Sequence, residues 1–266
     1  MDEVTGRDIT ETGEAGSAVL YLFSPDGHFV GRVSVTGEQI VHRAPVLLPV
    51  EALDRCHVST WTNAGAGQLF HSPAQGSGIE ERAVSLIEGE DTFHGTPDDL
   101  FFGHARLAPV GAAGPEVITL ARKNARMRIT VRGLDRRIPE DRYYLTVEIP
   151  NDGYDFVGNP IAGTARVRRT GAFRDNGDFS TDEAFNLIHT DPAVSPAGGV
   201  TVNLYEKALG RSADRLIASV TDDDGRPISL PAGRTVNLLI DLNEGEGLSV
   251  YTEITPWDEI YQWDIW

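Results

Sequence analysis

Apolar and polar positions along this chain repeat one short pattern, in which an apolar or alternating run ends at a turn signal. Residues 18–23 run into Pro25, Asp26 and Gly27, and residues 28–35 carry the chain back. β-Branched and aromatic residues on both arms, with Asp-Gly between them, predict a β-hairpin. Residues 216–220 and 228–230, on either side of the Asp-rich turn at 222–227, predict a second hairpin.

Similar runs along the rest of the chain predict a protein made of strands. The further runs are 39–42, 45–49, 56–61, 100–107, 117–120, 125–132, 143–149, 199–205, 234–240 and 261–265. Residues 80–87 fit a short helix or a strand, and residues 181–188 are the best candidate for a short helix. Because no segment has a convincing amphipathic helical spacing, the pattern predicts an all-β protein with little helix.

Alternation inside the runs also predicts which side chains are buried. Met127, Ile129 and Val131 share one face of their strand, which we expect to lie in the core. The other face carries arginines that we expect to be exposed, namely Arg126, Arg128 and Arg132. Trp61 and Trp263 fall at inward positions, and both are expected to be mostly buried.

The chain of 266 residues is long enough for two ordinary domains. Residues 108–115 have the Pro, Gly and Ala content of a linker, and the strand pattern restarts after them. We therefore expect a flexible acidic lead-in at 1–17, an N-terminal β-sandwich domain at 18–115 and a C-terminal β-sandwich domain at 116–266.

Charge and cysteine content exclude several classes of protein. The net charge of −17 argues against nucleic-acid binding, because phosphate groups would be repelled and no stripe of Lys and Arg offsets this. An acidic surface is typical of a protein that stays soluble after export. Cys56 is the single cysteine, so an intrachain disulfide is excluded. No apolar run approaches the length of a membrane span, and no signal peptide opens the chain.

No catalytic motif stands out in the sequence. Phosphate-binding loops, Cys-x-x-Cys pairs, zinc-protease motifs and serine nucleophile elbows are all missing. Cys56 and His57 are neighbours in a predicted strand, so their side chains point to opposite faces and cannot form a nucleophile–base pair. Cys56 is interpreted as a small core residue. We expect no enzyme activity; a hydrolase on a sandwich scaffold is disfavoured, since no nucleophile, base and acid set is visible.

No metal or cofactor site is predicted. A three-histidine site from His71, His94 and His104 is conceivable, but structural histidines are the default interpretation. The run from Asp222 to Gly225 resembles part of a calcium loop, yet the glutamate that such a loop needs downstream is missing. A tight hairpin turn is therefore favoured for this run.

The aromatic tail at 257–266 has two interpretations. Its rings are typical of a sugar-stacking platform, but alternation places Tyr261, Trp263 and Ile265 on an inward face. Core filling is favoured for Trp263, whereas Trp257 and Trp266 remain open between the two interpretations.

Several segments carry a family resemblance through their order. They are VLYLF with PDGHFV at 19–30, LP followed by VSTW at 48–61, DDLFFG at 98–103, and ITLARKNA with RITV at 118–131. The tail with Ile260 and Trp263 is also similar. Together, over residues 18–266, they resemble the type V pilus fimbrillins, and more closely the anchor or accessory-subunit branch of that family. This resemblance implies two transthyretin-like Greek-key β-sandwich domains and a non-enzymatic role in cell-surface fimbriae, with adhesion and assembly through strand-edge subunit interfaces.

The resemblance also implies partners and a location. We expect other fimbrial subunits to bind by β-strand addition, with host or bacterial surface ligands as further partners, on the bacterial outer membrane surface. The family's lipid-modified cysteine does not stand near this start, so a lipid anchor is not visible here. The lead-in offers only Val4 and Ile9 as sizeable apolar side chains, and we therefore expect the N-terminal domain to carry an open strand edge. The alternative function is a carbohydrate-binding or adhesin β-sandwich module.

Overall fold

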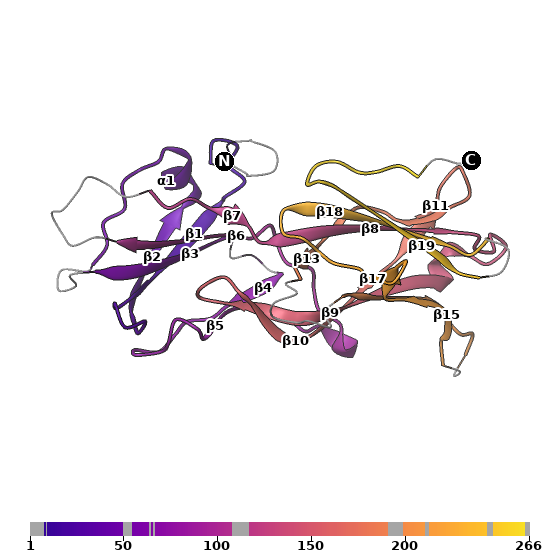
Figure 1. The fold of residues 1–266 in the computed structure, drawn as a ribbon, viewed down its shortest axis with the longest axis horizontal. Coiled ribbons are helices and arrows are strands. Elements are labelled where there is room, and N and C mark those ends of the chain that lie inside the picture. The colour runs from indigo at the N-terminus through magenta and orange to yellow at the C-terminus, as the bar shows by residue number, and fades with distance from the viewer. Residues whose placement is uncertain are drawn as a thin grey trace. The chain divides into compact units, whose positions relative to one another are not determined.

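The computed structural model describes residues 8, 10–49, 55–63, 65, 67–107, 117–190, 199–210, 213–243 and 247–263 (Figure 1). Its regular structure consists almost wholly of strands, which confirms the all-β prediction. Two compact units are formed. Unit 1 comprises Met1–Ile87, Pro97–Asn124 and Gly153–Ile161, and unit 2 comprises Glu88–Thr96, Ala125–Asp152 and Ala162–Trp266. The expected linker lies outside the described residues, so a domain boundary there stays a prediction.

The first sheet of unit 1 contains both arms of the first predicted hairpin. Its strands follow the order β2-β1-β3-β6-β7. Their bounds are β1 (Ser17–Phe23), β2 (Phe29–Thr36), β3 (Cys56–Thr62), β6 (Phe101–Leu107) and β7 (Ala121–Arg122). β1 and β2 pair antiparallel from Ser17 with Thr36 to Phe23 with Phe29, which confirms the hairpin.

A short helix, α1 (Gly37–Val41), stands where a strand was predicted at 39–42, so that prediction is wrong. The cause is local: the Thr36 hydroxyl accepts from the Gln39 amide, and the Gln39 side chain accepts from the Thr36 amide. This reciprocal capping box ends β2 and starts a helix in its place.

The second sheet of unit 1 holds β4 (Gln68–Phe70), β5 (Arg82–Leu86) and the last residues of β9 (Tyr143–Asp155). Residues 80–87 therefore contain a strand and not a helix. Between the sheets, Trp61 is fully buried, as predicted. Its ring centroid lies 4.8 Å from that of Phe102, 5.2 Å from Tyr154 and 6.5 Å from Phe70.

The first sheet of unit 1 is apolar on its other face as well. A second cluster of buried residues lies there: Ala18, Leu20, Leu22, Val35, Cys56 and Val58. Irregular segments cover it, with Val46 and Leu48 from one and Ile118 from the other packed against the cluster. Residues 45–49 and 117–120 were predicted as strands; they are not strands, but their apolar side chains cover a sheet face.

Unit 2 also contains two layers of strands. One holds β15 (Arg215–Val220), β14 (Thr201–Glu206), β9 and β10 (Pro160–Arg169). The other follows the order β11-β12-β8-β18-β19, with β13 also paired to β8. Its bounds are β8 (Asn124–Arg132), β11 (Gly171–Phe173), β12 (Phe179–Thr181), β13 (Phe185–Ile188), β18 (Arg234–Asp241) and β19 (Ser249–Pro256). β8 and β18 run parallel.

Three short elements complete the description: η1 (Glu90–Thr92), η2 (Glu140–Arg142), and the hairpin of β16 (Asp222–Asp223) and β17 (Arg226–Pro227).

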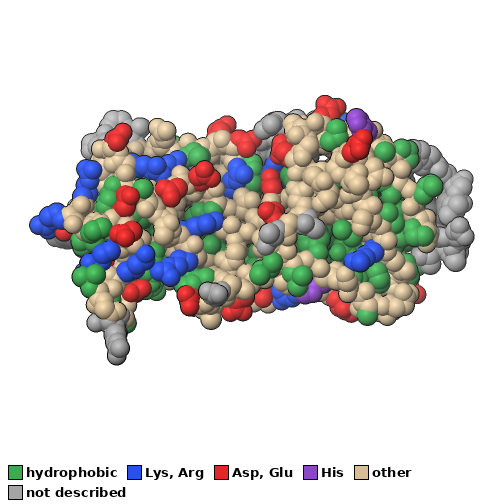
Figure 2. Space-filling model, turned by 180° about the vertical axis from the view of Figure 1, so that it is seen from behind, with side chains coloured by type: hydrophobic (Ala, Val, Ile, Leu, Met, Phe, Trp, Pro, Cys, Tyr) green, Lys and Arg blue, Asp and Glu red, His purple; other side chains and the backbone are tan. Residues whose placement is uncertain are grey.

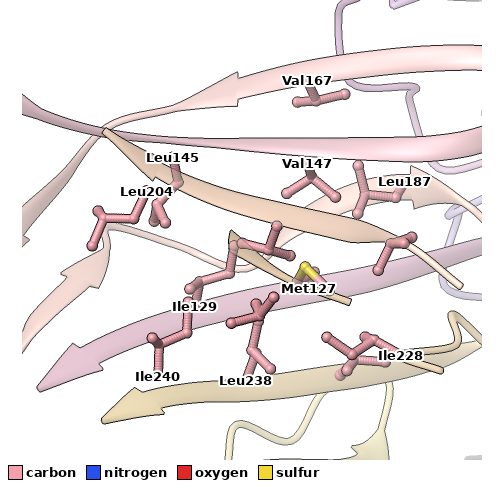
Figure 3. Close-up of a cluster of buried hydrophobic side chains, with 14 of the residues drawn as sticks. Met127, Ile129, Leu145, Val147, Val167, Leu187, Leu204, Ile228, Leu238 and Ile240 are labelled. Carbon is pink, nitrogen blue, oxygen red and sulfur yellow. The ribbon is translucent and has the colours of Figure 1, made fainter. Parts of the chain in front are cut away.

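Both layers of unit 2 project apolar side chains into one core (Figure 3). Met127, Ile129 and Val131 are fully buried there, which confirms the predicted face of β8. Leu145 and Val147 of β9 lie opposite them in the same core.

Four further predictions for unit 2 are corrected. The arginines on the other face of β8 (Arg126, Arg128 and Arg132) are half-buried and not exposed. Residues 181–188 form no helix: Thr181 ends β12, where its hydroxyl accepts from the Ile129 amide, and β13 follows.

Residues 228–230 are not a strand, although the Val200 amide donates to the Ile228 carbonyl and the Thr190 amide donates to the Leu230 carbonyl. The run at 261–265 is not a strand as far as it is described, and Trp263 is only half-buried.

We predict that Trp61→Ala destabilises unit 1 by about 3–5 kcal/mol, because a fully buried ring in contact with three aromatic side chains leaves a large cavity. Urea unfolding followed by circular dichroism measures the loss. Leu47→Ala is the matched control, since Leu47 is 92% exposed and should change stability by less than about 0.5 kcal/mol. A loss below about 1 kcal/mol for Trp61→Ala would contradict the packing described.

Candidate interaction surface

β2 is the outer strand of the first sheet in unit 1, with β1 as its strand partner. At its beginning, Phe29 donates to the Ser77 carbonyl at 2.8 Å and accepts from the Gly76 amide at 3.2 Å. Beyond Phe29, no described residue forms a backbone hydrogen bond along the outer side of this strand. The edge of β2 therefore presents backbone donors and acceptors in a row, which is a template for a further strand.

Apolar side chains stand beside this edge and are half-buried. Val30 and Val33 of β2, Ile40 of α1, and Val46 and Leu48 of the following segment all pack against the cluster on the sheet's outer face. Because each keeps part of its surface exposed, an added strand would find apolar contacts as well as hydrogen bonds.

One outer strand of unit 2, β19, differs, because a carboxylate occupies its edge. β19 pairs with β18 on one side. On the other side, Asp223 of the β16–β17 hairpin accepts from the Thr252 amide at 2.9 Å and from the Thr252 hydroxyl at 2.6 Å. An acidic side chain at that position protects the edge against pairing.

The residues just before β1 are held by a buried arginine. The Arg122 side chain is 3% exposed, and it pairs with the carboxylates of Glu14 (2.7 Å) and Asp99. The Arg122 guanidinium also lies over the Phe101 ring, 4.6 Å from its centroid. Because both carboxylates are about a quarter exposed, these ion pairs lie at the boundary of the core. Through Glu14 they connect the lead-in to the core.

Asn63 strengthens the same connection. Its amide group donates to the carbonyls of Glu14 and Asp99, and its carbonyl oxygen accepts from Gly16 at 2.8 Å. Gly37 begins α1 against Gly16, where a Cβ at position 37 would lie 2.5 Å from the Gly16 carbonyl. We call Glu14, Asn63, Asp99 and Arg122 the entry clamp. Within the described part of the lead-in, only Ser17 joins a strand; Val4 and Ile9 lie outside the described residues.

Sequence patterns do not predict the entry clamp. β7 is two residues long, so alternation assigns no face to Arg122. Glu14 lies 108 positions away in the sequence, and only the fold brings the two together.

The structure brings together one pair of histidines, His57 and His104. His57 Nδ1 lies 3.3 Å from His104 Nε2, and Arg106 lies 3.2 Å from His57 Nε2. Since arginine can only donate, His57 accepts at Nε2 and donates from Nδ1 to His104. Burial, with the nearby His57 and Arg106, lowers the pKa of His104 and so favours the neutral form of that ring.

The other candidate residues take structural roles. Cys56 and His57 point to opposite faces, with Cys56 buried, as expected. His71, His94 and His104 do not meet: His71 bonds the Ser85 hydroxyl at 2.6 Å, and His94 Nδ1 accepts from the Arg166 amide. Within the described ranges, no three His, Cys, Asp or Glu side chains are placed to hold a metal ion.

The run from Asp222 to Gly225 forms the predicted hairpin turn. The Asp222 carboxylate accepts from the Gly225 amide at 2.9 Å, and Asp224 and Gly225 both have positive φ, at 51° and 76°. Asp and Gly tolerate this left-handed region better than other residues do. The aspartates thus shape a turn.

The aromatic tail divides between the two interpretations. Trp257 is 3% exposed and stacks with Arg126, whose guanidinium lies 4.1 Å from the ring centroid. Tyr261 is exposed and Trp263 is half-buried, so the predicted inward face at these positions is wrong. The reason is that the strand ends at Pro256, and alternation does not apply beyond it. Trp266 lies outside the described residues.

Charge is mixed on the surface. On the face shown in Figure 2, basic side chains lie among acidic ones and form no single-sign stripe. Among the described residues, no helix is long and apolar enough to cross a membrane.

Comparison with known families decides the assignment. The family described as "Fimbrillin-A associated anchor proteins Mfa1 and Mfa2" matches residues 1–263. This chain belongs to that family. The resemblance inferred from the sequence is thereby confirmed, and the Mfa2 family match includes both units.

Curated relatives of this Mfa2-family chain are fimbrial anchoring subunits. The major fimbrium anchoring subunit FimB of Porphyromonas gingivalis ATCC 33277 is 25% identical over 269 residues, which cover 97% of this chain and 84% of FimB. FimB of strain W83 is 25% identical over 271 residues, with the same coverage.

Solved structures share the fold. The fimbrial anchor protein Mfa2 from P. gingivalis has a TM-score of 0.61 at 13% identity, covering 92% of this chain and 90% of that one. A structure from Bacteroides thetaiotaomicron, described as putative polysaccharide binding proteins, has a TM-score of 0.68 at 16% identity, covering 93% and 90%. These two likenesses concern the fold alone.

We predict that Arg122→Met destabilises unit 1 by about 2–3 kcal/mol and releases the residues before β1. Removing the buried cation leaves Glu14 and Asp99 without their ion pair, and partial exposure keeps the loss below that of a fully buried pair. Urea unfolding measures the first effect, and faster hydrogen exchange of residues 14–17 measures the second.

The matched control is Arg137→Met. Arg137 pairs with Asp135 and holds the pKa of that carboxyl at about 2, but its side chain is 90% exposed. We expect no measurable change in stability there, since solvent screens exposed ion pairs. Equal effects of the two substitutions would show that the entry clamp contributes nothing beyond a surface pair.

Proposed function

We propose that this chain is a non-enzymatic anchoring or accessory subunit of a fimbrium at the surface of the outer membrane. Membership of the Mfa2 family supports the fimbrial role, and the relatives named as anchoring subunits support the position at the anchored end. The fold agrees with that of a fimbrial anchor protein.

The chain joins its neighbouring subunit by strand addition at the edge of β2. The observation that carries this proposal is the outer side of β2, where no described residue forms a backbone hydrogen bond beyond Phe29. An incoming strand gains main-chain hydrogen bonds from the edge and inserts alternate side chains against Val30, Val33 and Ile40.

Of the two outer strands β2 and β19, β2 provides this edge. In unit 2, the Asp223 carboxylate already accepts from the Thr252 amide of the outer strand β19. A second strand on β19 would have to displace that carboxylate and bury its charge, which is costly. β2 has no such carboxylate among its described contacts.

Attachment to the outer membrane takes place through a lipid, while other exposed faces are available for host or bacterial surface ligands. Fractionation of producing cells tests the location: the protein should be found with the outer membrane and be accessible to added protease on intact cells. Recovery from the cytoplasm would contradict the proposal.

We predict that Val33→Lys abolishes the association with partner subunits, because a lysine on an edge strand disfavours further pairing. The tagged chain is produced together with the fimbrillin-type subunits of its own organism, and co-purified subunits are quantified by mass spectrometry. The unaltered chain should retain a neighbouring subunit, and Val33→Lys should retain less than about a tenth of it.

The matched control is Ile254→Lys on β19, where the side chain is 47% exposed on the outer strand of unit 2. It should leave co-purification unchanged. If Ile254→Lys abolishes the association and Val33→Lys does not, the joining edge lies in unit 2 and the proposal for β2 is wrong. Circular dichroism of both variants confirms folding before the comparison is made.

A further inference from the structure

Two arginines lie together on the outer face of the β11-β12-β8-β18-β19 sheet in unit 2. Arg128 of β8 and Arg174, which follows β11, are both half-buried, and each has a buried Nε atom that no described group accepts from. Ile129, the neighbour of Arg128 on β8, donates from its amide to the Thr181 hydroxyl, so Arg128 lies beside the end of β12 to which Arg174 is bound. Burial and the positive charge of Arg174 both lower the pKa of Arg128. Arg174 also donates to the carbonyls of Thr181 and Asp182, which fixes its position.

The neighbouring arginines on the same strand have acidic partners. Arg132 pairs with Asp178 at 3.3 Å and Asp241 at 3.6 Å, and Arg126 lies 3.9 Å from Asp258. For Arg128 and Arg174, no carboxylate among the described residues forms an ion pair. In a chain of net charge −17, this is a local concentration of positive charge without an acidic ion-pair partner among the described residues.

Exposed aromatic rings stand on the same face. Trp263 lies 4.9 Å from Tyr261 and 6.5 Å from Tyr251, measured between ring centroids. Tyr251 and Tyr261 are each 40% exposed, and Trp263 is half-buried. Such a group of rings on a folded sheet is larger than the isolated apolar side chains of an ordinary surface.

The sheet register connects the rings to the arginines. Asn237 of β18 is the Cα partner of Arg128, and its side-chain oxygen accepts from the Tyr261 amide at 3.2 Å. In the next row, Thr130 is the partner of Leu239, and Leu239 is the partner of Tyr251. Tyr261 thus lies beside β18, one strand from β8, and Tyr251 lies on β19, two strands or roughly 10 Å from β8, whereas Arg174 contacts the end of β12 on the other side of β8.

We propose that this face of unit 2 is a binding site for a carbohydrate that carries carboxylate groups. The rings of Tyr261 and Trp263 provide the surface on which a sugar ring packs. Arg128 and Arg174 provide two guanidinium groups for a carboxylate, an anion whose geometry arginine matches with two parallel hydrogen bonds. The site is separate from the edge of β2 and adds a ligand to the fimbrial role.

Charge complementarity favours a sparsely charged glycan over other acidic partners. A nucleic acid, with a phosphate at each nucleotide, would meet the repulsion of the whole acidic chain. Glu253, which faces outward beside Asn237, would repel a second anion placed over β19. A sugar chain with single carboxylates between neutral rings places its charge at the arginines and its neutral ring at the aromatic side chains.

The test uses a hyaluronan tetrasaccharide and its carboxyl-reduced form, in which each carboxylate is replaced by a neutral hydroxymethyl group on the same ring. Binding is measured by isothermal titration calorimetry on the full chain. We expect the acidic form to bind about tenfold more tightly, the effect of one hydrogen-bonded charge. The double variant Arg128→Gln, Arg174→Gln should lose this preference, and Trp263→Ala should weaken both forms by about tenfold. Higher salt should reduce the preference, since the site is partly exposed.

Arg166→Gln is the matched control, because Arg166 is an exposed cation in the other layer of unit 2, where it pairs with Glu148 at 2.8 Å. It should leave both affinities within about twofold. The proposal is overturned if the unaltered chain does not bind the acidic tetrasaccharide, if Arg166→Gln removes the preference as fully as the double variant, or if a Glu-rich peptide of equal charge binds as tightly. If the unaltered chain binds the glycan but does not co-purify with a neighbouring subunit, only the proposal for the edge of β2 is contradicted.

Discussion

The first sheet of unit 1 must be covered on both of its faces, and much of this unit follows from that requirement. Trp61 and its aromatic neighbours lie on one side, and Leu20, Leu22 and Val58 lie on the other. Among the described residues, no sheet covers the second face. Irregular segments provide Val46, Leu48 and Ile118 instead, because burial of apolar surface does not require regular structure. Since these segments run over the face of the sheet, the edge of β2 remains open beyond Phe29 to a partner strand.

The same requirement explains where sequence patterns succeeded and where they did not. Alternation identified β8 and its buried face because Met127, Ile129 and Val131 face the core while polar groups alternate with them. It also read residues 45–49 and 117–120 as strands, since apolar runs that cover a sheet look like strands in one dimension. The Thr36 and Gln39 capping box was visible in the sequence as a helix start, yet the β-branched residues beside it concealed this.

Polar contacts over long separations could not be predicted from the sequence. Arg122 meets Glu14, and Arg128 lies beside Arg174, only because strands distant in the chain become neighbours. In the aromatic tail, the prediction failed for a local reason. Alternation was extended past Pro256, where β19 ends, so Tyr261 and Trp263 were assigned inward positions that they do not occupy. The family resemblance needed no such contacts, because it rested on short segments whose order along the chain is retained.

The family match concerns the role of the whole chain, whereas the hydrogen bonds concern individual outer strands. The match to residues 1–263 assigns the chain to the fimbrial anchor proteins as a whole. The hydrogen bonds at the outer strands then distinguish β2 from β19, since the Asp223 carboxylate occupies the edge of β19.

Unit 1 is discontinuous in the chain, and this has a consequence for the order in which the protein is completed. Tyr154, which packs on Trp61, and Phe156, which packs on Tyr21, come from the stretch Gly153–Ile161. Because the chain is made from its N-terminus onward, unit 1 lacks these rings until the stretch that ends at residue 161 has been made. By then β8 and most of β9, which belong to unit 2, are already present. The N-terminal sandwich therefore cannot close as an independent early domain, and its core stays incomplete until part of unit 2 has been made.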